Sequence, residues 1–183
     1  MNILYLDMKI ICILIVSIMA LNCKPTKSID TQNKTHDQVK DCPEDGNCTF
    51  EVLTNSAFEI KKDEYGLSYG KLVVSDKTLL RFEYIPNTPE NTADGQYNEL
   101  IYIEIDPDTE MLDLKDEDLK KANVTFGRVC FCPGQNGYYP VTKGQLKLSK
   151  LKDNSFELSL NFRAKDLPQV ITQINKSFKL EQP

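Results

Sequence analysis

Cysteines are the residues of this chain whose type and spacing point most directly to chemistry. The sequence holds six, and after Cys12 and Cys23 near the amino terminus four remain: Cys42, Cys48, Cys130 and Cys132. A four-thiolate zinc site usually needs cysteine pairs with two residues between them. Five residues separate the first pair here and one separates the second. The spacing therefore favours a structural framework of two disulfides over a metal site or a redox-active pair.

The pairing of these four cysteines has three solutions that sequence alone leaves open. If Cys130 and Cys132 both lie in an extended strand, they point to the same face about 6.5 to 7 Å apart and pair poorly with each other. This geometry weakens the local pairing without excluding it, and the two pairings in which each cysteine reaches back to Cys42 or Cys48 stay open beside it. Such bridges would connect the start of the domain to a much later strand.

A second candidate is a turn rich in carboxylates, which are the ligands that calcium prefers. Four of them follow one another closely: Asp106, Asp108, Glu110 and Asp113. A calcium-binding EF-hand loop beginning at Asp106 would need glycine at its sixth position and glutamate at its twelfth, where Met111 and Glu117 stand. We interpret the segment as a solvated acidic turn, and we expect no bound metal or cofactor.

A third candidate is the segment from Pro133 to Pro140, which we expect to form a loop because of its glycines and prolines. It carries Asn136 and the adjacent pair Tyr138 and Tyr139. Tyrosine rings on a loop can stack on sugars or anchor a protein partner, so these three residues are the predicted ligand-binding set. The alternative is that one tyrosine packs over the end of the domain and the glycines only serve the turn.

Several function classes lack the residues they need. The only histidine, His36, lies in a polar segment, so no serine, histidine and aspartate triad can be assembled. No phosphate-binding glycine loop is present. The net charge is −5 and no basic stripe alternates with aromatic residues, so we expect no nucleic-acid partner. We predict that the protein is not an enzyme.

The amino terminus has the pattern of an export signal. Lys9 precedes an apolar run over residues 10–21, which ends at Asn22 and Cys23, and the chain can begin at Met1 or at Met8. As a helix the run would span about 18 Å, too short for the roughly 30 Å of a bilayer core. A secretory peptide without lipidation and a retained membrane helix are the two alternatives.

The residues Ala20-Leu21-Asn22-Cys23 resemble the leader of bacterial lipoproteins, in the relaxed form found in Bacteroidota and spirochaetes. The resemblance covers only the leader and Cys23. It implies that the chain is cut before Cys23, that this thiol is lipidated, and that the acyl chains hold the protein at the cell envelope, most simply at the outer membrane.

Three parts follow from this interpretation. Residues 1–22 are the signal peptide, and residues 23–41 are the lipidated cysteine and a flexible polar tether. Residues 42–183 are a single disulfide-stapled β domain. Removal of the leader would leave 183 − 22 = 161 residues, enough for one domain with a core of its own.

Apolar residues in that domain recur mostly at every second position, the period of half-buried strands. We predict a mainly β fold: an antiparallel β-sandwich or open barrel of about nine short strands, with at most one or two short helices. Residues 97–105 should be covered on both faces, and Asp116 should cap a short helix over 116–122. Hairpins are expected across Asp76-Lys77 and Asp153-Asn154, with a closing strand over 176–180.

The function expected from these features is a membrane-anchored lipoprotein of the cell envelope. Its domain would be a non-enzymatic binding or structural module with a protein or glycan partner. The alternative is a carboxylate-dependent glycan hydrolase, which would need two carboxyl groups facing each other about 5 to 9.5 Å apart in a cleft.

Overall fold

The structure is a computed structural model and describes residues 34–35, 42–66, 68–88 and 95–180. This part of the chain forms antiparallel strands and one short 3₁₀ helix, η1 (Asp116–Ala122). The strands are β1 (Lys34–Thr35), β2 (Gly46–Leu53), β3 (Ser56–Lys62), β4 (Ser68–Val74), β5 (Thr78–Pro86), β6 (Tyr97–Ile105), β7 (Met111–Lys115), β8 (Thr125–Cys130), β9 (Gly137–Pro140), β10 (Gly144–Lys150), β11 (Ser155–Phe162) and β12 (Gln173–Lys179).

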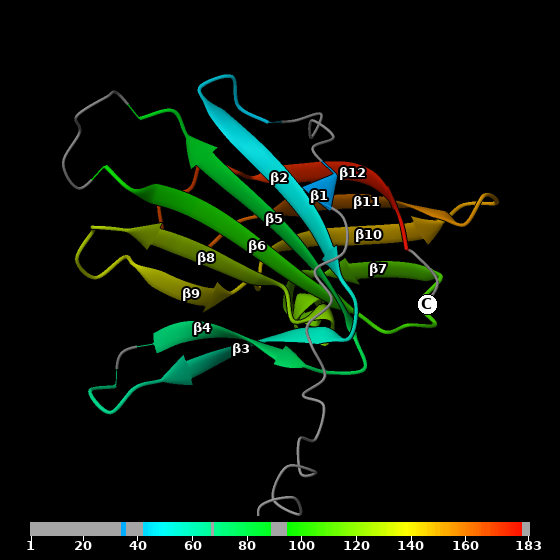
Figure 1. The fold of residues 1–183 in the computed structure, drawn as a ribbon, viewed down its shortest axis with the longest axis horizontal. Helices are drawn as coiled ribbons and strands as arrows, with labels where there is room; N and C mark the ends of the chain where they lie inside the picture. Colours follow the sequence, from blue (N-terminus) through cyan, green and yellow to red (C-terminus); the bar gives the residue numbers. More distant parts are fainter. Residues whose placement is uncertain (1–33, 36–41, 67, 89–94, 181–183) are drawn as a thin grey trace, which may run out of the picture.

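The strands make two packed sheets and a separate hairpin. One sheet has the order β1-β2-β5-β6-β8-β9 and the other the order β12-β11-β10-β7 (Figure 1). The hairpin β3-β4 is a two-stranded sheet of its own and lies along β9. No described strand of one sheet pairs with a strand of the other, and side chains of both sheets pack in one core. The mainly β prediction is confirmed, although the described strands β1 to β12 outnumber the nine or so that were expected.

The main core fills the space between the two sheets. Phe82, Ile101 and Phe126 point into it from the six-stranded sheet, and Leu146 and Leu160 from the four-stranded sheet, each at most 2 % exposed. Alternation produces this arrangement, because every second residue of a strand faces the same side. We call the other side of the six-stranded sheet, turned away from this core, the outer face.

Several predicted elements are confirmed. β10 and β11 form the hairpin expected across Asp153-Asn154, and β12 is the closing strand. In β6, Leu100 and Tyr102 are buried on the outer face while Ile101 and Ile103 are buried in the main core. The prediction that both faces of this strand are covered is therefore correct.

The predicted hairpin across Asp76-Lys77 is wrong. β4 pairs only with β3, while β5 pairs with β2 and β6. The chain instead folds back at Asp63–Gly66, and Ser75–Lys77 carry it from the hairpin onto the main sheet. Both turns have suitable polar residues, and alternation identifies a strand without identifying its partner.

The amino-terminal part of the helix and the predicted tether also differ from expectation. Asp116 has a φ of 51° and does not cap η1, and its carboxylate accepts a hydrogen bond from the Gly144 N–H at 3.1 Å. Lys34 and Thr35, inside the predicted tether, pair with Glu51 and Phe50 of β2. Main-chain pairing at a sheet edge needs no apolar side chain, so a polar sequence does not exclude it.

Candidate functional site

The four cysteines form two local disulfides, Cys42–Cys48 and Cys130–Cys132. Of the three pairings that the sequence left open, the structure shows the local one, which strand geometry had disfavoured. Cys130 ends β8, and the chain leaves the strand direction at Phe131, which brings the Cα atoms of Cys130 and Cys132 to 5.3 Å. That distance lies in the usual range for a disulfide. In an extended strand the Cα atoms of alternate residues are about 6.5 to 7 Å apart, which is at or beyond the upper end of this range.

The predicted tyrosine pair is divided between the two faces of the sheet. The segment Gly137–Pro140 is strand β9 and not a loop, so adjacent residues point to opposite sides. Tyr138 packs on the outer face, and Tyr139 packs against the main core. Asn136 holds the turn between β8 and β9, since its Oδ1 accepts a hydrogen bond from the Cys130 N–H at 3.4 Å. Only Tyr138 belongs to the site described below.

The four carboxylates of the acidic turn are not gathered around a common point. Asp106 pairs with Lys77, Glu110 with Lys150, and Asp113 accepts from the Gln145 side chain at 2.6 Å, while Asp108 is exposed. Within the described residues no group of three or more histidine, cysteine, aspartate or glutamate side chains is placed to hold a metal ion. Cys23 and His36 lie outside the described residues.

A network of charged and polar side chains crosses the outer face, and we call it the outer-face network: Glu51, Arg81, Glu83 and Asn98. Arg81 donates from Nη1 to Glu51 Oε2 at 3.1 Å and from Nη2 to Glu83 Oε2 at 2.7 Å. Asn98 Nδ2 donates to the other oxygen of Glu83 at 2.9 Å. Glu51 lies directly opposite Arg81 on the neighbouring strand, the position where opposite charges stabilise a sheet.

Arg81 is not fully satisfied by these partners. Its side chain is 27 % exposed, yet Nε is buried and has no hydrogen-bond partner. A guanidinium has five N–H donors in a fixed plane, so the two glutamates leave donors available for a further acceptor. Arg81 is therefore partly open to solvent, while its unpartnered Nε is buried.

Three aromatic rings adjoin this network, and we call them the aromatic cluster: Phe58, Tyr102 and Tyr138. Tyr102 lies opposite Arg81 in the β5-β6 register, which makes the network and the cluster contiguous. Phe58 of β3 stacks on Tyr102 with ring centroids 3.8 Å apart and an interplanar angle of 9°. Burial raises the pKa of Tyr102 to about 12, against a smaller lowering by the charge of Arg81.

Two glycines make room for the Tyr138 ring. A Cβ built on Gly70 of β4 or on Gly127 of β8 would come within 2.8 Å of ring atoms of Tyr138. The ring consequently lies between the hairpin and the sheet, 5.0 Å from the centroid of Phe58. Its position explains why the strand beside it carries no side chain at residue 127.

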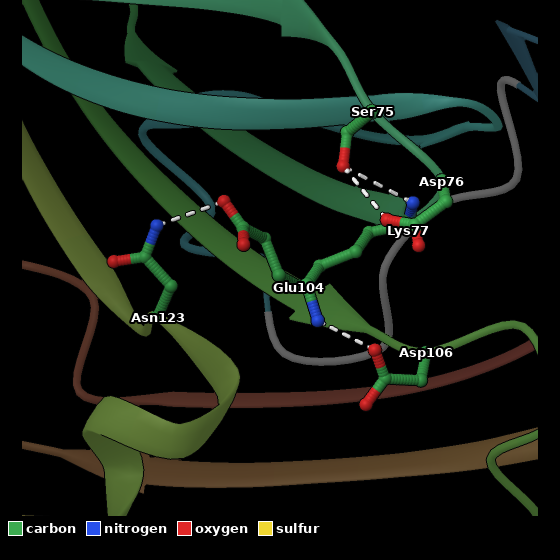
Figure 2. A network of polar contacts seen from close by, with 6 residues as sticks. All are labelled: Ser75, Asp76, Lys77, Glu104, Asp106 and Asn123. Carbon is green, nitrogen blue, oxygen red and sulfur yellow. Dashed lines mark hydrogen bonds and ion pairs between the residues drawn. The ribbon is translucent and has the colours of Figure 1, made fainter.

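Polar contacts at the base of the hairpin hold Phe58 in place. Its N–H donates to Glu104 Oε1 at 2.9 Å, and its carbonyl accepts from Asn123 Nδ2 at 3.0 Å. Asn123 Nδ2 also lies 2.8 Å from Glu104 Oε1, as Figure 2 shows. In the same view Lys77 reaches Asp106, where the chain passes from the hairpin to β5. Both backbone polar groups of Phe58 are therefore bound by side chains of the main body.

A separate carboxylate, Glu99, is completely buried on the core side of β6. Its oxygens accept from the N–H groups of Val170 at 2.6 Å and Ile171 at 2.7 Å, and from the Tyr97 hydroxyl at 2.5 Å. Burial, followed by the hydrogen bond to Glu99, raises the pKa of Tyr97 to about 12. We interpret Glu99 as a structural clamp, because it fastens the segment before β12 to the opposite sheet.

The sequence contained a signal for both polar sites. Arg81 and Glu83 stand at alternate positions of a strand whose other residues are largely apolar, and Glu99 interrupts a run that is buried on both faces. Charged residues in such strands need partners. The partners themselves come from other strands, which pattern alone does not identify.

Comparison of the chain with protein-family models, with curated proteins and with solved structures finds no match. In the part of the chain that the structure describes, no helix has the length and apolar character needed to cross a membrane.

Proposed function

We propose that the protein is a lipoprotein of the bacterial cell envelope, anchored through Cys23 at the outer membrane, and that its β domain is a non-enzymatic binding module. The anchor rests on the leader that ends at Cys23. The compartment is supported by the two disulfides, because disulfides persist outside the reducing cytosol.

The observation that carries the binding role is the outer face. There, the outer-face network, which is partly open to solvent at Arg81, adjoins the half-buried Tyr138, and the other two rings of the aromatic cluster, Phe58 and Tyr102, lie buried where the hairpin meets the sheet. Aromatic faces beside hydrogen-bonding groups are the usual composition of sites for peptides and glycans. The ligand is accordingly a protein or glycan partner that meets this face.

The hydrolase alternative is less well supported by the same residues. A glycosidase needs a carboxyl group on each side of the scissile bond, with the substrate between them. Within the outer-face network the two carboxylates, Glu51 and Glu83, are both bonded to Arg81, whose guanidinium lies between them.

The anchor is tested by the intact mass of protein extracted from membranes. We expect a chain that begins at Cys23 and carries the added mass of acyl groups. Reduction should add 2 × 2 = 4 hydrogen atoms for the two disulfides. An unacylated chain of any length in the membrane extract contradicts the proposal.

A further inference from the structure

The β3-β4 hairpin is attached to the rest of the molecule in an unusual way. It pairs with no strand of either sheet, and its far half is exposed, with Tyr65 at the turn 81 % exposed. Its apolar contacts with the outer face come from Phe58 and Leu72, which pack with Leu53, Leu79, Leu100, Tyr102 and Tyr138. The hairpin therefore docks through the half nearer its base, where Gly70 of β4 also lies against the Tyr138 ring.

Both ends of the hairpin leave the main sheet at the same point. Ser56 N–H donates to the Lys77 carbonyl at 2.9 Å, and Ser75 N–H donates to the Asn55 carbonyl at 3.0 Å. Asn55 has a φ of 52°, so the chain turns sharply before β3 begins. Rotation about this two-chain base would lift the hairpin without disturbing any strand pairing in the two main sheets.

Phe58 occupies a position that recognises one residue of an extended strand. Glu104 accepts from its N–H, Asn123 donates to its carbonyl, and the Tyr102 and Tyr138 rings enclose its side chain. We call this position the Phe58 seat. None of these four side chains belongs to the hairpin, whose own Gly70 and Leu72 also lie against Phe58. Another extended segment with an aromatic side chain can therefore make the contacts that the main body supplies.

We propose that the Phe58 seat is a binding site for an extended peptide segment bearing an aromatic side chain, and that the hairpin is its internal occupant. The hairpin opens as a unit, and the partner's aromatic residue replaces Phe58. An empty seat would expose a contiguous apolar patch, which favours either occupant over the vacant state. This inference rests on the proposed binding role and is independent of lipidation, so its failure leaves the mass test unaffected.

The test compares the wild-type protein with Phe58→Ala, which removes the aromatic ring from the seat and keeps the backbone groups that bond to Glu104 and Asn123. The probe is a labelled peptide with the sequence of residues 54–62, and the control probe has alanine in place of its phenylalanine. We expect Phe58→Ala to bind the phenylalanine peptide at least roughly tenfold more tightly than wild type does, because the internal competitor has lost its aromatic ring. The alanine peptide should bind at least roughly tenfold more weakly.

Tyr69→Ala is the matched control, since it removes an exposed aromatic ring of the same hairpin and leaves the seat filled. It should bind the peptide as weakly as wild type. Equal affinity of wild type and Phe58→Ala, equal affinity for both peptides, or no binding by Phe58→Ala would each overturn the proposal.

Hydrogen exchange of the wild-type protein gives a second test that does not depend on a substitution. Amides of β3 and β4 should exchange together, and faster than those of β5 and β6, because opening of the hairpin costs less than global unfolding. Protection of β3 and β4 equal to that of β5 and β6 would exclude the opening and overturn the proposal.

Discussion

At the scale of single residues, polar groups in this protein are placed where a second strand or turn supplies their partners. Arg81 meets Glu51 across one strand pair and Glu83 two residues along its own strand. Glu99 meets two main-chain N–H groups that lie about seventy residues later in the sequence. Each charge is compensated by a partner, which is the condition for placing charged groups in a largely buried setting.

The disulfide pairing gives a prediction at this scale. Trypsin cuts after Lys40, Lys61, Arg128 and Lys143. Local pairing therefore leaves peptides 41–61 and 129–143 separate without reduction, each lighter by two hydrogen atoms than its reduced form. A cross-linked species of the two peptides in the unreduced digest would instead establish the long-range bridges.

The buried tyrosines give a second residue-scale prediction. The pKa of Tyr102 is raised to about 12, so the native state retains a proton that the unfolded state loses near pH 10. The resulting stability is complete below about pH 10 and is lost as the pH rises through about 12.

Tyrosinate absorbance during an alkaline titration checks this. The wild type should show a late step near pH 12 from Tyr84, Tyr97 and Tyr102, and Tyr102→Phe should lose about a third of its amplitude. An unchanged late step in the variant would show that Tyr102 titrates with the exposed tyrosines.

At the scale of elements, β6 joins the parts of the fold. Its core side carries Glu99, which holds the segment before β12, and its outer side carries Tyr102 and Glu104, which hold the hairpin. One strand thus supports the four-stranded sheet on one face and the β3-β4 hairpin on the other. This double role accounts for the apolar run over residues 100–103 in the middle of the strand.

The Glu99 clamp is tested by Glu99→Gln, which keeps the shape of the side chain and replaces one acceptor with a donor. We expect the free energy of unfolding to fall by about 2 kcal/mol, because a main-chain N–H loses a charged acceptor inside the core. Urea denaturation measures the change. Glu157→Gln, at an exposed position of β11, is the control and should change stability by less than about 0.5 kcal/mol.

A loss in Glu99→Gln no larger than that of the Glu157→Gln control would mean that Glu99 is not a clamp.

The elements also show that the sequence predicts individual strands better than it predicts how they pair. Alternation correctly identified β6, β10, β11 and β12, because each has one face or both faces in a core. Alternation does not identify the partner of a strand. The predicted hairpin across Asp76-Lys77 would join β4 to β5, whereas β4 pairs with β3.

The candidate site was less predictable than the fold. Tyr138 was expected to bind, but its neighbours Phe58, Arg81 and Tyr102 come from three other strands, and their proximity depends on sheet order. Of the segment 133–140, expected to be a loop, residues 133–136 form a turn and Gly137–Pro140 form β9, because the edge of a sheet accepts glycine and proline.

At the scale of the whole molecule, the proposed binding role concerns the surfaces outside the packed core between the two sheets. The outer face is one of them, and a net charge of −5 over the chain favours protein or glycan partners over nucleic acid. The proposed anchor adds a condition, since a lipidated domain meets its partners at a membrane.

The most direct measurement of that anchor is membrane fractionation of cells producing Cys23→Ser beside Cys12→Ser. The second variant removes a leader cysteine that the proposal does not use. We predict that Cys12→Ser stays in the membrane fraction like wild type and that Cys23→Ser leaves it. Retention of Cys23→Ser in the membrane fraction, with its leader removed as in wild type, would contradict the account.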